Sequence, residues 1–354
     1  MPDCKKKIEI RALNPEEISA LIAVWGEKPF RGQQIFHWLQ EKAVPSFDEM
    51  TNLSLDLRKK LTHAFPFVPL KMLKEAVSKD GTRKYLWETV EGLNLESVLL
   101  FHQGERTRKR NTLCVSTQIG CPLGCQFCAT GKLGFRRNLT VNEIMGQVLE
   151  VTAHWRKKDK EFKINNVVYM GMGEPLLNLS AVLRSIYLLN HQDGQNIGMR
   201  RITLSTCGLV PQIDLLAEEK LDLVLAISLH APTNQLRQQL MPINQQYPLE
   251  ELMSACQRYI SKTGRRITFE YLLIRGVNDS LDQAQKLVDL LRNTAANVNL
   301  IPLNPIPASD LERPTAVQIK KFASFLRKKG INVVLREEKG SDIAGACGQL
   351  AGVE

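Results

Sequence analysis

The sequence has no hydrophobic run long enough to cross a membrane. Its longest apolar candidate, residues 221–231, is shorter than the roughly 18 residues of a membrane-spanning helix, and Asp222, Ser228 and His230 interrupt it. The N-terminal residues 1–7 include consecutive lysines and lack the apolar segment of a secretory signal. We therefore expect a soluble, cytoplasmic protein that has no membrane partner.

Acidic residues are fewer than basic ones. The chain of 354 residues has 37 Asp and Glu against 47 Lys and Arg, which gives a formal net charge of +10. This excess favours a polyanionic partner such as a nucleic acid. Internal repeats and low-complexity linkers are absent. With 44% hydrophobic and 24% charged residues, the composition excludes a fully disordered chain.

Two regions differ in their hydrophobic pattern. Residues 1–95 are predicted to form an N-terminal, mainly helical domain with short strands. Residues 96–354 alternate between strand-like and helix-like segments, which predicts a parallel sheet with right-handed crossovers. About six βα units and a last short strand favour an α/β fold with a partial, open βα barrel. The predicted strands are 112–117, 165–170, 201–206, 222–229, 266–273, 297–302 and 331–336, and the predicted helices are 141–155, 179–190, 210–219, 249–262, 280–293 and 315–329.

Three of the eight cysteines gather in one loop after the first predicted strand of the barrel. Cys121, Cys125 and Cys128 have C-x3-C-x2-C spacing, so their thiolates can converge on one soft metal centre. Zinc is the alternative, but a structural zinc site needs four ligands and no second cysteine pair lies nearby. Three cysteines would leave one iron of a [4Fe–4S] cluster open to a small molecule. This spacing is the signature of radical S-adenosylmethionine (SAM) enzymes.

A glycine-rich turn and a ring of polar residues point to one pocket around this loop. The turn, residues 171–175, follows an apolar strand and carries Glu174, which could bind an ammonium group. By themselves, the turn and His230 would more often be structural features. Because the carboxyl ends of parallel strands form the active-site face of such folds, we expect a cofactor pocket there. Polar residues at the predicted strand ends are Ser205, Thr206, Ser228, His230, Glu270 and Asn304.

Other residues near the cysteine loop also suggest functions. Lys132, Arg136 and Arg137 follow the loop directly, a position that suits contacts with phosphate groups. Cys114 lies on the first predicted strand of the barrel, and Cys347 lies in a glycine-rich tail that could reach over a site. Taken singly, either cysteine would more often be a small buried hydrophobic residue. The same structural role is predicted for Cys4, Cys207 and Cys256.

Several ordered motifs together resemble the RlmN/Cfr family of radical SAM enzymes, which methylate an adenine in RNA. The resemblance extends from about Lys28 to the tail. Within the family, FEYLL (269–273) and NLIPLNP (299–305) resemble the enzymes that methylate carbon 2 of adenine more than those that methylate carbon 8. The remaining motifs are CVSTQIGCPLGCQFCATG (114–131), RNLT (137–140), GMGEP (171–175), SLHAP (228–232), LMPIN (240–244) and ACGQL (346–350).

The resemblance implies a fold and two cofactors. The fold is a partial βα barrel with an N-terminal helical domain that contacts RNA. The cofactors are a [4Fe–4S] cluster, held by Cys121, Cys125 and Cys128, and SAM. The implied SAM-binding residues are Gly173, Glu174, Ser205, Ser228, Leu229, His230 and Asn304.

The resemblance also implies a route for the methyl group. Cys347 would accept a methyl group from one SAM, and a second SAM, cleaved at the cluster, would yield a 5′-deoxyadenosyl radical. That radical would take hydrogen from the methyl group, leaving a carbon radical that adds to the adenine ring. Glu96 would remove the ring proton, and Cys114 would release the product through a transient disulfide with Cys347. We expect the surroundings of Cys347 to lower its pKa, because the thiolate is the methyl acceptor.

Three functions follow from these observations. The first is methylation of carbon 2 of an adenine in large-subunit ribosomal RNA and in transfer RNA. The second keeps the radical chemistry but methylates carbon 8, which gives antibiotic resistance. The third is a non-catalytic iron–sulfur or zinc RNA-binding protein. For the enzymatic functions we expect a monomer that receives electrons from a donor such as flavodoxin.

Overall fold

The computed structural model describes residues 8–65, 67, 70–102, 110–307 and 309–352. Cys4 and nearly all of the basic segment that precedes the first strand of the barrel lie outside these residues. Within the described part of the chain, no helix combines the length and the apolar character that a membrane crossing requires.

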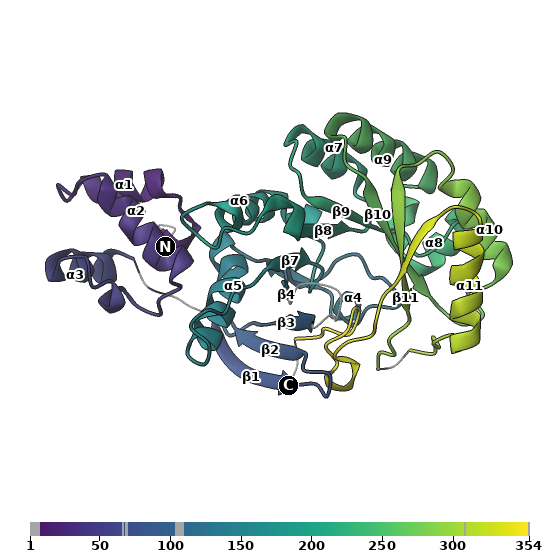
Figure 1. Ribbon diagram of the computed structural model, residues 1–354, viewed down its shortest axis with the longest axis horizontal. Coiled ribbons are helices and arrows are strands. Elements are labelled where there is room, and N and C mark those ends of the chain that lie inside the picture. Colours follow the sequence, from purple (N-terminus) through teal and green to yellow (C-terminus); the bar gives the residue numbers. More distant parts are fainter. Residues whose placement is uncertain (1–7, 66, 68–69, 103–109, 308, 353–354) are drawn as a thin grey trace, which may run out of the picture.

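The N-terminal part is a small helical unit at one end of the molecule (Figure 1). It contains α1 (Pro15–Ala23), α2 (Phe30–Phe36) with a π-helical turn directly after it, and α3 (Leu55–Ala64). The side chain of Asn14 accepts a hydrogen bond from the Glu17 backbone, and the Glu17 carboxylate accepts one from Asn14, so α1 begins with a capping box. Apolar side chains on one side of these helices are buried against each other and against the barrel: Ile18, Ile22, Ile35, Phe36, Leu57 and Leu61.

The described strands form one large sheet and one small hairpin. The order in the large sheet is β1-β2-β3-β4-β7-β8-β9-β10-β11-β12. The first three, β1 (Lys71–Val77), β2 (Arg83–Glu88) and β3 (Asn94–His102), pair in antiparallel fashion, and β3 pairs antiparallel with β4 (Arg110–Cys114). All later neighbours pair in parallel from β4 onwards. The parallel strands are β7 (Asn166–Tyr169), β8 (Ile202–Thr206), β9 (Val224–Ser228), β10 (Ile267–Leu273), β11 (Ala296–Pro302) and β12 (Asn332–Leu335).

The helices that connect the parallel strands lie along the outer side of the curved sheet (Figure 1). The first of them, α5 (Val141–Arg156), begins at a capping box between Thr140 and Glu143, and its apolar stripe is buried. Because β12 is an edge strand and does not pair with β1, the barrel stays open, and the predicted fold class is confirmed. A further helix, α8 (Asn234–Leu240), was not predicted. The others are α6 (Leu179–Asn190), α7 (Val210–Glu218), α9 (Leu249–Thr263), α10 (Leu281–Leu290) and α11 (Ala316–Lys328).

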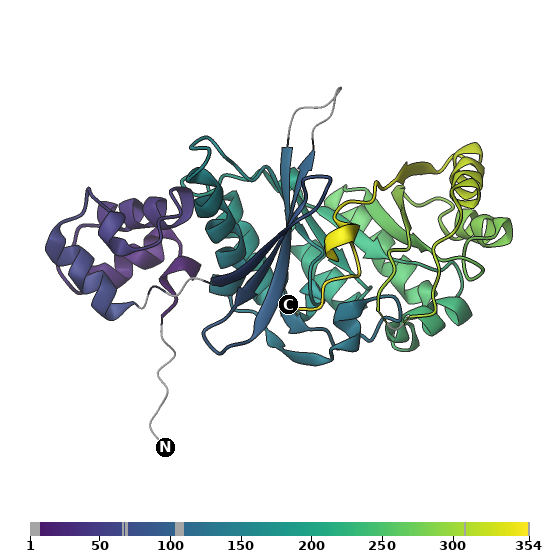
Figure 2. The same ribbon diagram turned by 90° about the horizontal axis from the view of Figure 1, so that it is seen from below.

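Two features of the fold bear on domain organisation and on the tail. The predicted domain boundary, between residues 95 and 96, falls inside β3, because β1 to β3 extend the sheet of the barrel. The helical unit itself ends with α3, and the division into two domains stays a prediction. Figure 2 shows the C-terminal segment, in yellow, lying between the antiparallel strands and the last strands of the barrel.

Candidate active site

A cavity lies at the carboxyl ends of the parallel strands, where the sequence predicts a pocket. It encloses about 1000 Å³ of space not filled by protein atoms, part of it open to solvent. Because each parallel strand ends at this face, residues far apart in the sequence meet there. Nine of the thirteen predicted site residues line this cavity, namely Cys121, Cys125, Cys128, Gly173, Glu174, Ser205, Ser228, His230 and Cys347.

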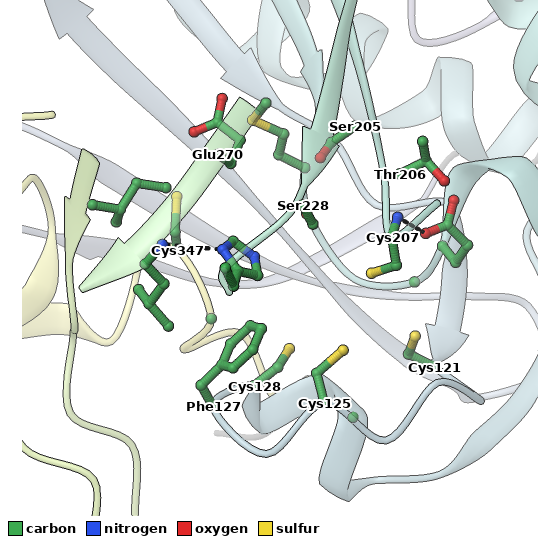
Figure 3. A pocket seen from close by; sticks show the side chains of 18 of the residues that line it. Cys121, Cys125, Phe127, Cys128, Ser205, Thr206, Cys207, Ser228, Glu270 and Cys347 are labelled. Atoms are coloured by element: carbon green, nitrogen blue, oxygen red, sulfur yellow. Dashed lines mark hydrogen bonds between the residues drawn. The ribbon is translucent and has the colours of Figure 1, made fainter. Parts of the chain in front are cut away.

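The cysteine loop forms one wall of this cavity (Figure 3). The loop leaves β5 (Gln118–Gly120) and ends at the short helix α4 (Ala129–Lys132), and β5 pairs with β6 (Phe135–Asn138). Gly120 has a φ of +72°, and a Cβ at this position would lie 1.8 Å from the Gly134 carbonyl oxygen. Only glycine allows this close crossing, so the hairpin determines where the cysteine loop begins.

The side chains of Cys121, Cys125 and Cys128 face a common space, but they lie too far apart in space to share one metal ion. Among the described residues, no three His, Cys, Asp or Glu side chains converge closely enough to hold a single metal ion. Cys121, Cys125 and Cys128 instead surround a cavity with room for a larger group, and electrostatic interactions link them. Thiolate sulfurs are the protein ligands of iron–sulfur clusters, so this donor set fits a [4Fe–4S] cluster.

The glycine-rich turn holds Glu174 beneath the cavity. Gly173 has a φ of +97°, and a Cβ there would lie 2.5 Å from Cβ of Gln118. The Glu174 backbone donates a hydrogen bond to the Gln118 side chain, and the two Glu174 carboxylate oxygens accept hydrogen bonds from the backbones of Leu176, at 3.0 Å, and Cys207, at 2.8 Å. Burial raises the pKa of Glu174, and these hydrogen bonds oppose the rise. The turn therefore places a fully buried carboxyl group in the cavity wall.

His230 has an unusual backbone conformation and a neutral ring. Its φ is +58°, which is rare for a residue other than glycine. Nδ1 accepts a hydrogen bond from the Leu272 backbone at 3.0 Å, and the ring meets Phe127 edge to face, with centroids 4.8 Å apart. Burial and the charge of Arg237 lower the pKa of His230 to about 3. The ring is therefore uncharged at neutral pH, and its Nε2–H is the group left to donate to a ligand.

Two predicted SAM-binding residues do not line the cavity around Cys121, Cys125 and Cys128, which we call the cluster cavity. Leu229 is fully buried, and its backbone N–H donates to the Glu270 carbonyl at 3.1 Å. Asn304 lines an adjoining cavity, where its Nδ2 donates to the Cys347 carbonyl at 3.2 Å. The Asn304 Oδ1 atom is buried and has no hydrogen-bond partner in the described part of the chain. A buried acceptor without a partner is unfavourable, so Asn304 fits a ligand that donates a hydrogen bond.

The adjoining cavity, inside the barrel, brings the two other predicted cysteines together. It encloses about 1920 Å³, including open solvent, and is lined by both Cys114 and Cys347. Cys347 lines both cavities and therefore stands at their junction. All cysteines that the structure describes are free thiols, so Cys114 and Cys347 are not joined by a disulfide. Burial raises the pKa of Cys114 to about 12.

The prediction that the surroundings of Cys347 lower its pKa is wrong. Its side chain is exposed on one side, but it sits in the cavity wall, where protein atoms displace much of the water. This desolvation raises the pKa of the thiol, because it penalises the charged form. Arg336 lowers the pKa and Glu270 raises it, but neither effect exceeds that of desolvation.

Glu96 lies outside both cavities. It belongs to β3 and is 1% exposed. Its Oε1 forms an ion pair with Lys84 at 2.7 Å, and its Oε2 accepts hydrogen bonds from the backbones of Ala351, at 2.8 Å, and Gly352, at 3.0 Å. In this conformation the carboxylate anchors the tail that carries Cys347.

The tail is also tied to the cysteine loop. The Ala129 backbone donates to the Gly348 carbonyl at 2.7 Å, and the Thr130 hydroxyl donates to the Leu350 carbonyl at 2.6 Å. Ala129 and Thr130 immediately follow Cys128. The position of Cys347 therefore depends on the same segment that carries the three cysteines.

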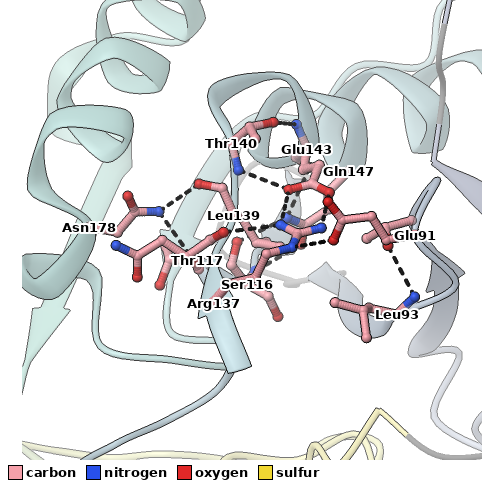
Figure 4. A network of polar contacts seen from close by, with 12 residues as sticks. Glu91, Leu93, Ser116, Thr117, Arg137, Leu139, Thr140, Glu143, Gln147 and Asn178 are labelled. Atoms are coloured by element: carbon pink, nitrogen blue, oxygen red, sulfur yellow. Dashed lines mark hydrogen bonds and ion pairs between the residues drawn. The ribbon is translucent and has the colours of Figure 1, made fainter. Parts of the chain in front are cut away.

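Of the basic residues that follow the loop, Arg137 is engaged within the protein (Figure 4). Its guanidinium forms ion pairs with Glu91 and Glu143, each at 2.8 Å. These carboxylates raise the pKa of Arg137, and they compensate its charge. Arg137 therefore joins the start of α5 to the turn after β2, whereas Arg136 is exposed. Contact of Lys132, Arg136 and Arg137 with phosphate groups stays a prediction.

Sequence reasoning missed the places of three residues, two in the cavity walls and one beside Glu96. Cys207 lines the cluster cavity beside Cys125, with its backbone carbonyl accepting a hydrogen bond from Arg237 at 2.6 Å. Arg336 lines both cavities, and Lys84 pairs with Glu96. The available signals were the position of Cys207 directly after a strand end and that of Arg336 at the end of the last strand. No sequence pattern indicated Lys84, because its pairing with Glu96 comes from strand register.

Comparison with known proteins gives consistent matches. A family model described as "Radical SAM superfamily" matches residues 115–291, and one described as "Ribosomal RNA large subunit methyltransferase N-terminal domain" matches residues 8–65. The chain is 49% identical over 344 residues to the "Probable dual-specificity RNA methyltransferase RlmN" of Heliobacterium modesticaldum, covering 97% of this chain and 89% of that protein. It is 50% identical over 339 residues to the protein of that name from Thermotoga neapolitana, covering 96% of each.

A solved structure supports the same assignment. The crystal structure of a radical SAM methyltransferase from Sphaerobacter thermophilus matches with a TM-score of 0.92 and 45% identity, covering 98% of this chain and 100% of that one. The match spans the helical unit, the open barrel and the tail. This chain therefore belongs to the RlmN family of the radical SAM superfamily.

Proposed function

We propose that this protein methylates carbon 2 of an adenine in large-subunit ribosomal RNA and uses SAM as the methyl donor. The observation that carries the proposal is the near full-length identity to relatives named as RNA methyltransferases, together with a cysteine-lined cavity at the expected face of the barrel. The family model for the helical unit carries a ribosomal RNA methyltransferase name, which supports ribosomal RNA as the substrate class.

We assign the two cofactors to the cluster cavity and to its junction with the cavity inside the barrel. Cys121, Cys125 and Cys128 would hold a [4Fe–4S] cluster, which supplies, when bound, the electron for reductive cleavage of SAM. Around it, His230 offers a neutral N–H donor, and Asn304 offers an acceptor that has no partner. Glu174 holds the loop that carries Cys207. The residues assigned to SAM are Gly173, Glu174, Ser205, Ser228, Leu229, His230 and Asn304.

We assign the carrier role to Cys347 and the resolving role to Cys114. A thiol at the junction of two cavities can meet a small methyl donor on one side and an RNA base on the other. Cys114 lines the second cavity with Cys347, and an electrostatic interaction links the two thiols. Their shared location supports a transient disulfide between them during product release.

Glu96 is proposed as the base that removes the ring proton. The Lys84 ion pair orients its carboxylate, and the tail backbone occupies its second oxygen. The tail must therefore leave Oε2 before this oxygen can accept a proton. Because the tail also carries Cys347, its movement would expose the base and displace the carrier together.

Nucleoside analysis of RNA treated with the enzyme tests the function directly. Protein reconstituted with iron and sulfide without oxygen is incubated with SAM, a chemical reductant and unmodified ribosomal RNA. The expected product is 2-methyladenosine. An exclusively 8-methyladenosine product would move the protein to the antibiotic-resistance activity, and absence of any SAM cleavage would favour a non-catalytic RNA-binding protein.

The remaining assignments concern partners and location. We propose that transfer RNA is a second substrate, because the relatives are named dual-specificity enzymes. We also propose a cytoplasmic monomer that receives electrons from a flavodoxin-type donor. Reaction with purified transfer RNA, light scattering of the reconstituted protein and substitution of flavodoxin for the chemical reductant test these points in turn.

A further inference from the structure

One cation, Arg336, lines both of the cavities around the thiols that the proposed reaction requires. Arg336 directly follows β12, and its backbone N–H donates to the Leu300 carbonyl of β11 at 2.9 Å, so the last strand positions it. It is half-buried and lines both the cluster cavity and the cavity inside the barrel. Within the described part of the chain, its guanidinium has no hydrogen bond or ion pair, so its charge is not compensated by a direct partner there.

Cys347 and Cys114 approach Arg336 from different elements. Cys347 comes from the tail and, like Arg336, lines both cavities. Cys114 comes from the end of β4 and shares the cavity inside the barrel with both residues. The positive charge of Arg336 lowers the pKa of each thiol, in opposition to burial, which raises both. Desolvation alone would keep both sulfurs protonated at neutral pH.

The other charged or titratable groups near Cys347 do not favour its thiolate. Glu270 of β10 is 4% exposed, and one of its carboxylate oxygens accepts a hydrogen bond from Asn299 at 2.8 Å. Its negative charge raises the pKa of Cys347. Arg336 and Glu270 are the charged groups that act on the pKa of Cys347. The other titratable groups that line the two cavities include Cys114, the cysteines of the loop, Cys207, Glu174, His230, His102, Arg110, Glu337, Glu338 and Lys339. Figure 3 shows Glu270 and Cys347 on one side of the cavity, across from the cysteine loop.

We propose that Arg336 stabilises the thiolate forms of Cys347 and Cys114, and so acts as a positioning and electrostatic residue for both thiol steps. The inference rests on the proposed function, in which Cys347 accepts a methyl group. In that step the Cys347 proton leaves to water, a bond forms between its sulfur and the methyl carbon, and the bond from that carbon to the SAM sulfonium breaks. The products are methyl-Cys347 and S-adenosylhomocysteine, and no electron is gained or lost. In release, the Cys114 thiolate attacks the sulfur of Cys347 and forms the disulfide, while the bond from that sulfur to the transferred carbon breaks. That carbon keeps the electron pair of the broken bond and takes up a proton, which makes it the methyl group of the product.

The test measures thiolate formation without RNA and without turnover. Cluster-loaded protein is treated anaerobically with iodoacetamide across a range of pH, and alkylation of Cys347 and Cys114 is followed on their separate peptides by mass spectrometry. Thiolates react and thiols do not, so the midpoint of each profile reports the pKa. The variants are Arg336→Gln, Arg336→Lys and Glu270→Gln, and Lys328→Gln on the exposed face of α11 removes an equal charge outside the cavities.

The proposal predicts shifts of opposite sign. Loss of a nearby opposite charge should raise the midpoints of Cys347 and Cys114 in Arg336→Gln by about one pH unit, which slows alkylation at neutral pH about tenfold. Arg336→Lys, which keeps the charge, should rescue most of this loss and shows whether the glutamine variant is merely misfolded. Glu270→Gln should lower the midpoint of Cys347 by a smaller amount, and Lys328→Gln should match the wild type.

Three outcomes would decide against the proposal. If the alkylation profiles of Arg336→Gln equal those of the wild type, Arg336 does not stabilise the two thiolates. Unchanged profiles with weaker binding of an RNA fragment would make Arg336 a contact for the substrate instead. Equal loss in the lysine and glutamine variants would show that shape, and not charge, matters. Failure of the wild type to methylate Cys347 would refute the proposed function, whereas the alkylation profiles would still test Arg336.

Discussion

The two walls of the candidate active site are built in different ways. The loop wall, residues 121–132, carries its three cysteines within one short segment, and a hairpin and a tight glycine determine its start. The tail wall, residues 340–350, holds Cys347 through contacts with residues distant in sequence, including Thr130 and Asn304. A local segment can hold an inorganic group rigidly, whereas a tail held by a few hydrogen bonds can move. The difference suits a fixed cofactor and a mobile carrier.

The largest expected effect comes from breaking the loop wall. Cys125→Ala should abolish methylation, because one of three cluster ligands is lost, and iron content should fall from about four per chain to a small fraction. Iron and sulfide analysis with visible absorbance measures this. Cys256→Ala, at a buried cysteine of α9 outside both cavities, is the control and should keep its iron. Full iron content in Cys125→Ala would show that the loop wall does not hold the cluster as assigned.

Breaking the tail wall should abolish methylation without loss of the cluster. Cys347→Ala removes the proposed carrier but no ligand, so iron content and reductive SAM cleavage should stay near the wild-type level. The intact mass of the tail peptide should show a methyl group in the wild type and none in the variant. Cys114→Ala is the matched comparison, since it should keep the methyl group on Cys347 but fail to release product. Methylated RNA from Cys347→Ala would refute the carrier role.

Glu96 tests the comparison between the two walls further. Its carboxylate binds the tail backbone in the structure and, in the proposed reaction, removes a proton from the substrate. Glu96→Gln should lower turnover by about 10²- to 10⁴-fold, the range for loss of a general base. It should also increase hydrogen exchange in residues 345–352, because a neutral amide is a weaker acceptor for the tail backbone. Lys84→Gln separates the roles, since it removes the ion pair but leaves the carboxylate, and a smaller loss is expected. Unchanged turnover in Glu96→Gln would exclude it as the base.

The smallest effect is expected where the two walls touch. Thr130→Val removes the hydroxyl that donates to the Leu350 carbonyl but keeps the shape of the side chain. The free energy of unfolding should fall by about 1 kcal/mol, the usual net value of one hydrogen bond, as measured by denaturant titration. Methylation should fall by less than about fivefold. A large loss of activity with unchanged stability would show that this contact sets the position of Cys347.

Much of the fold could be predicted from the sequence. The seven strands expected from residue 112 onwards correspond to β4 and to β7–β12, and the six expected helices all form within a few residues of their predicted bounds. Each element carries a local signal, such as the capping box at Thr140 and Glu143 or an apolar strand before a glycine turn. The short α8 was missed, because five of its seven residues are polar and only Leu236 and Leu240 are apolar.

Only part of the candidate site could be predicted from the sequence. The cysteine loop and the strand-end residues Ser205, Ser228 and His230 share the cavity, because parallel strands bring their ends to one face. Glu96 was taken for a residue near the substrate, and its engagement with Lys84 and the tail depends on strand register and on chain segments more than 250 residues apart. The pKa of Cys347 was predicted in the wrong direction, because desolvation depends on surrounding atoms that no sequence pattern reports.

The sequence by itself determined the alternation of strands and helices, the cysteine spacing and the family, since these follow from local patterns and short motifs. The tertiary structure decided which thiols meet, which carboxylate anchors the tail and which cation stands between the two cavities. The physical reason is that spacing along the chain controls local geometry, whereas burial, charge pairing and cavity shape arise only where distant segments pack together.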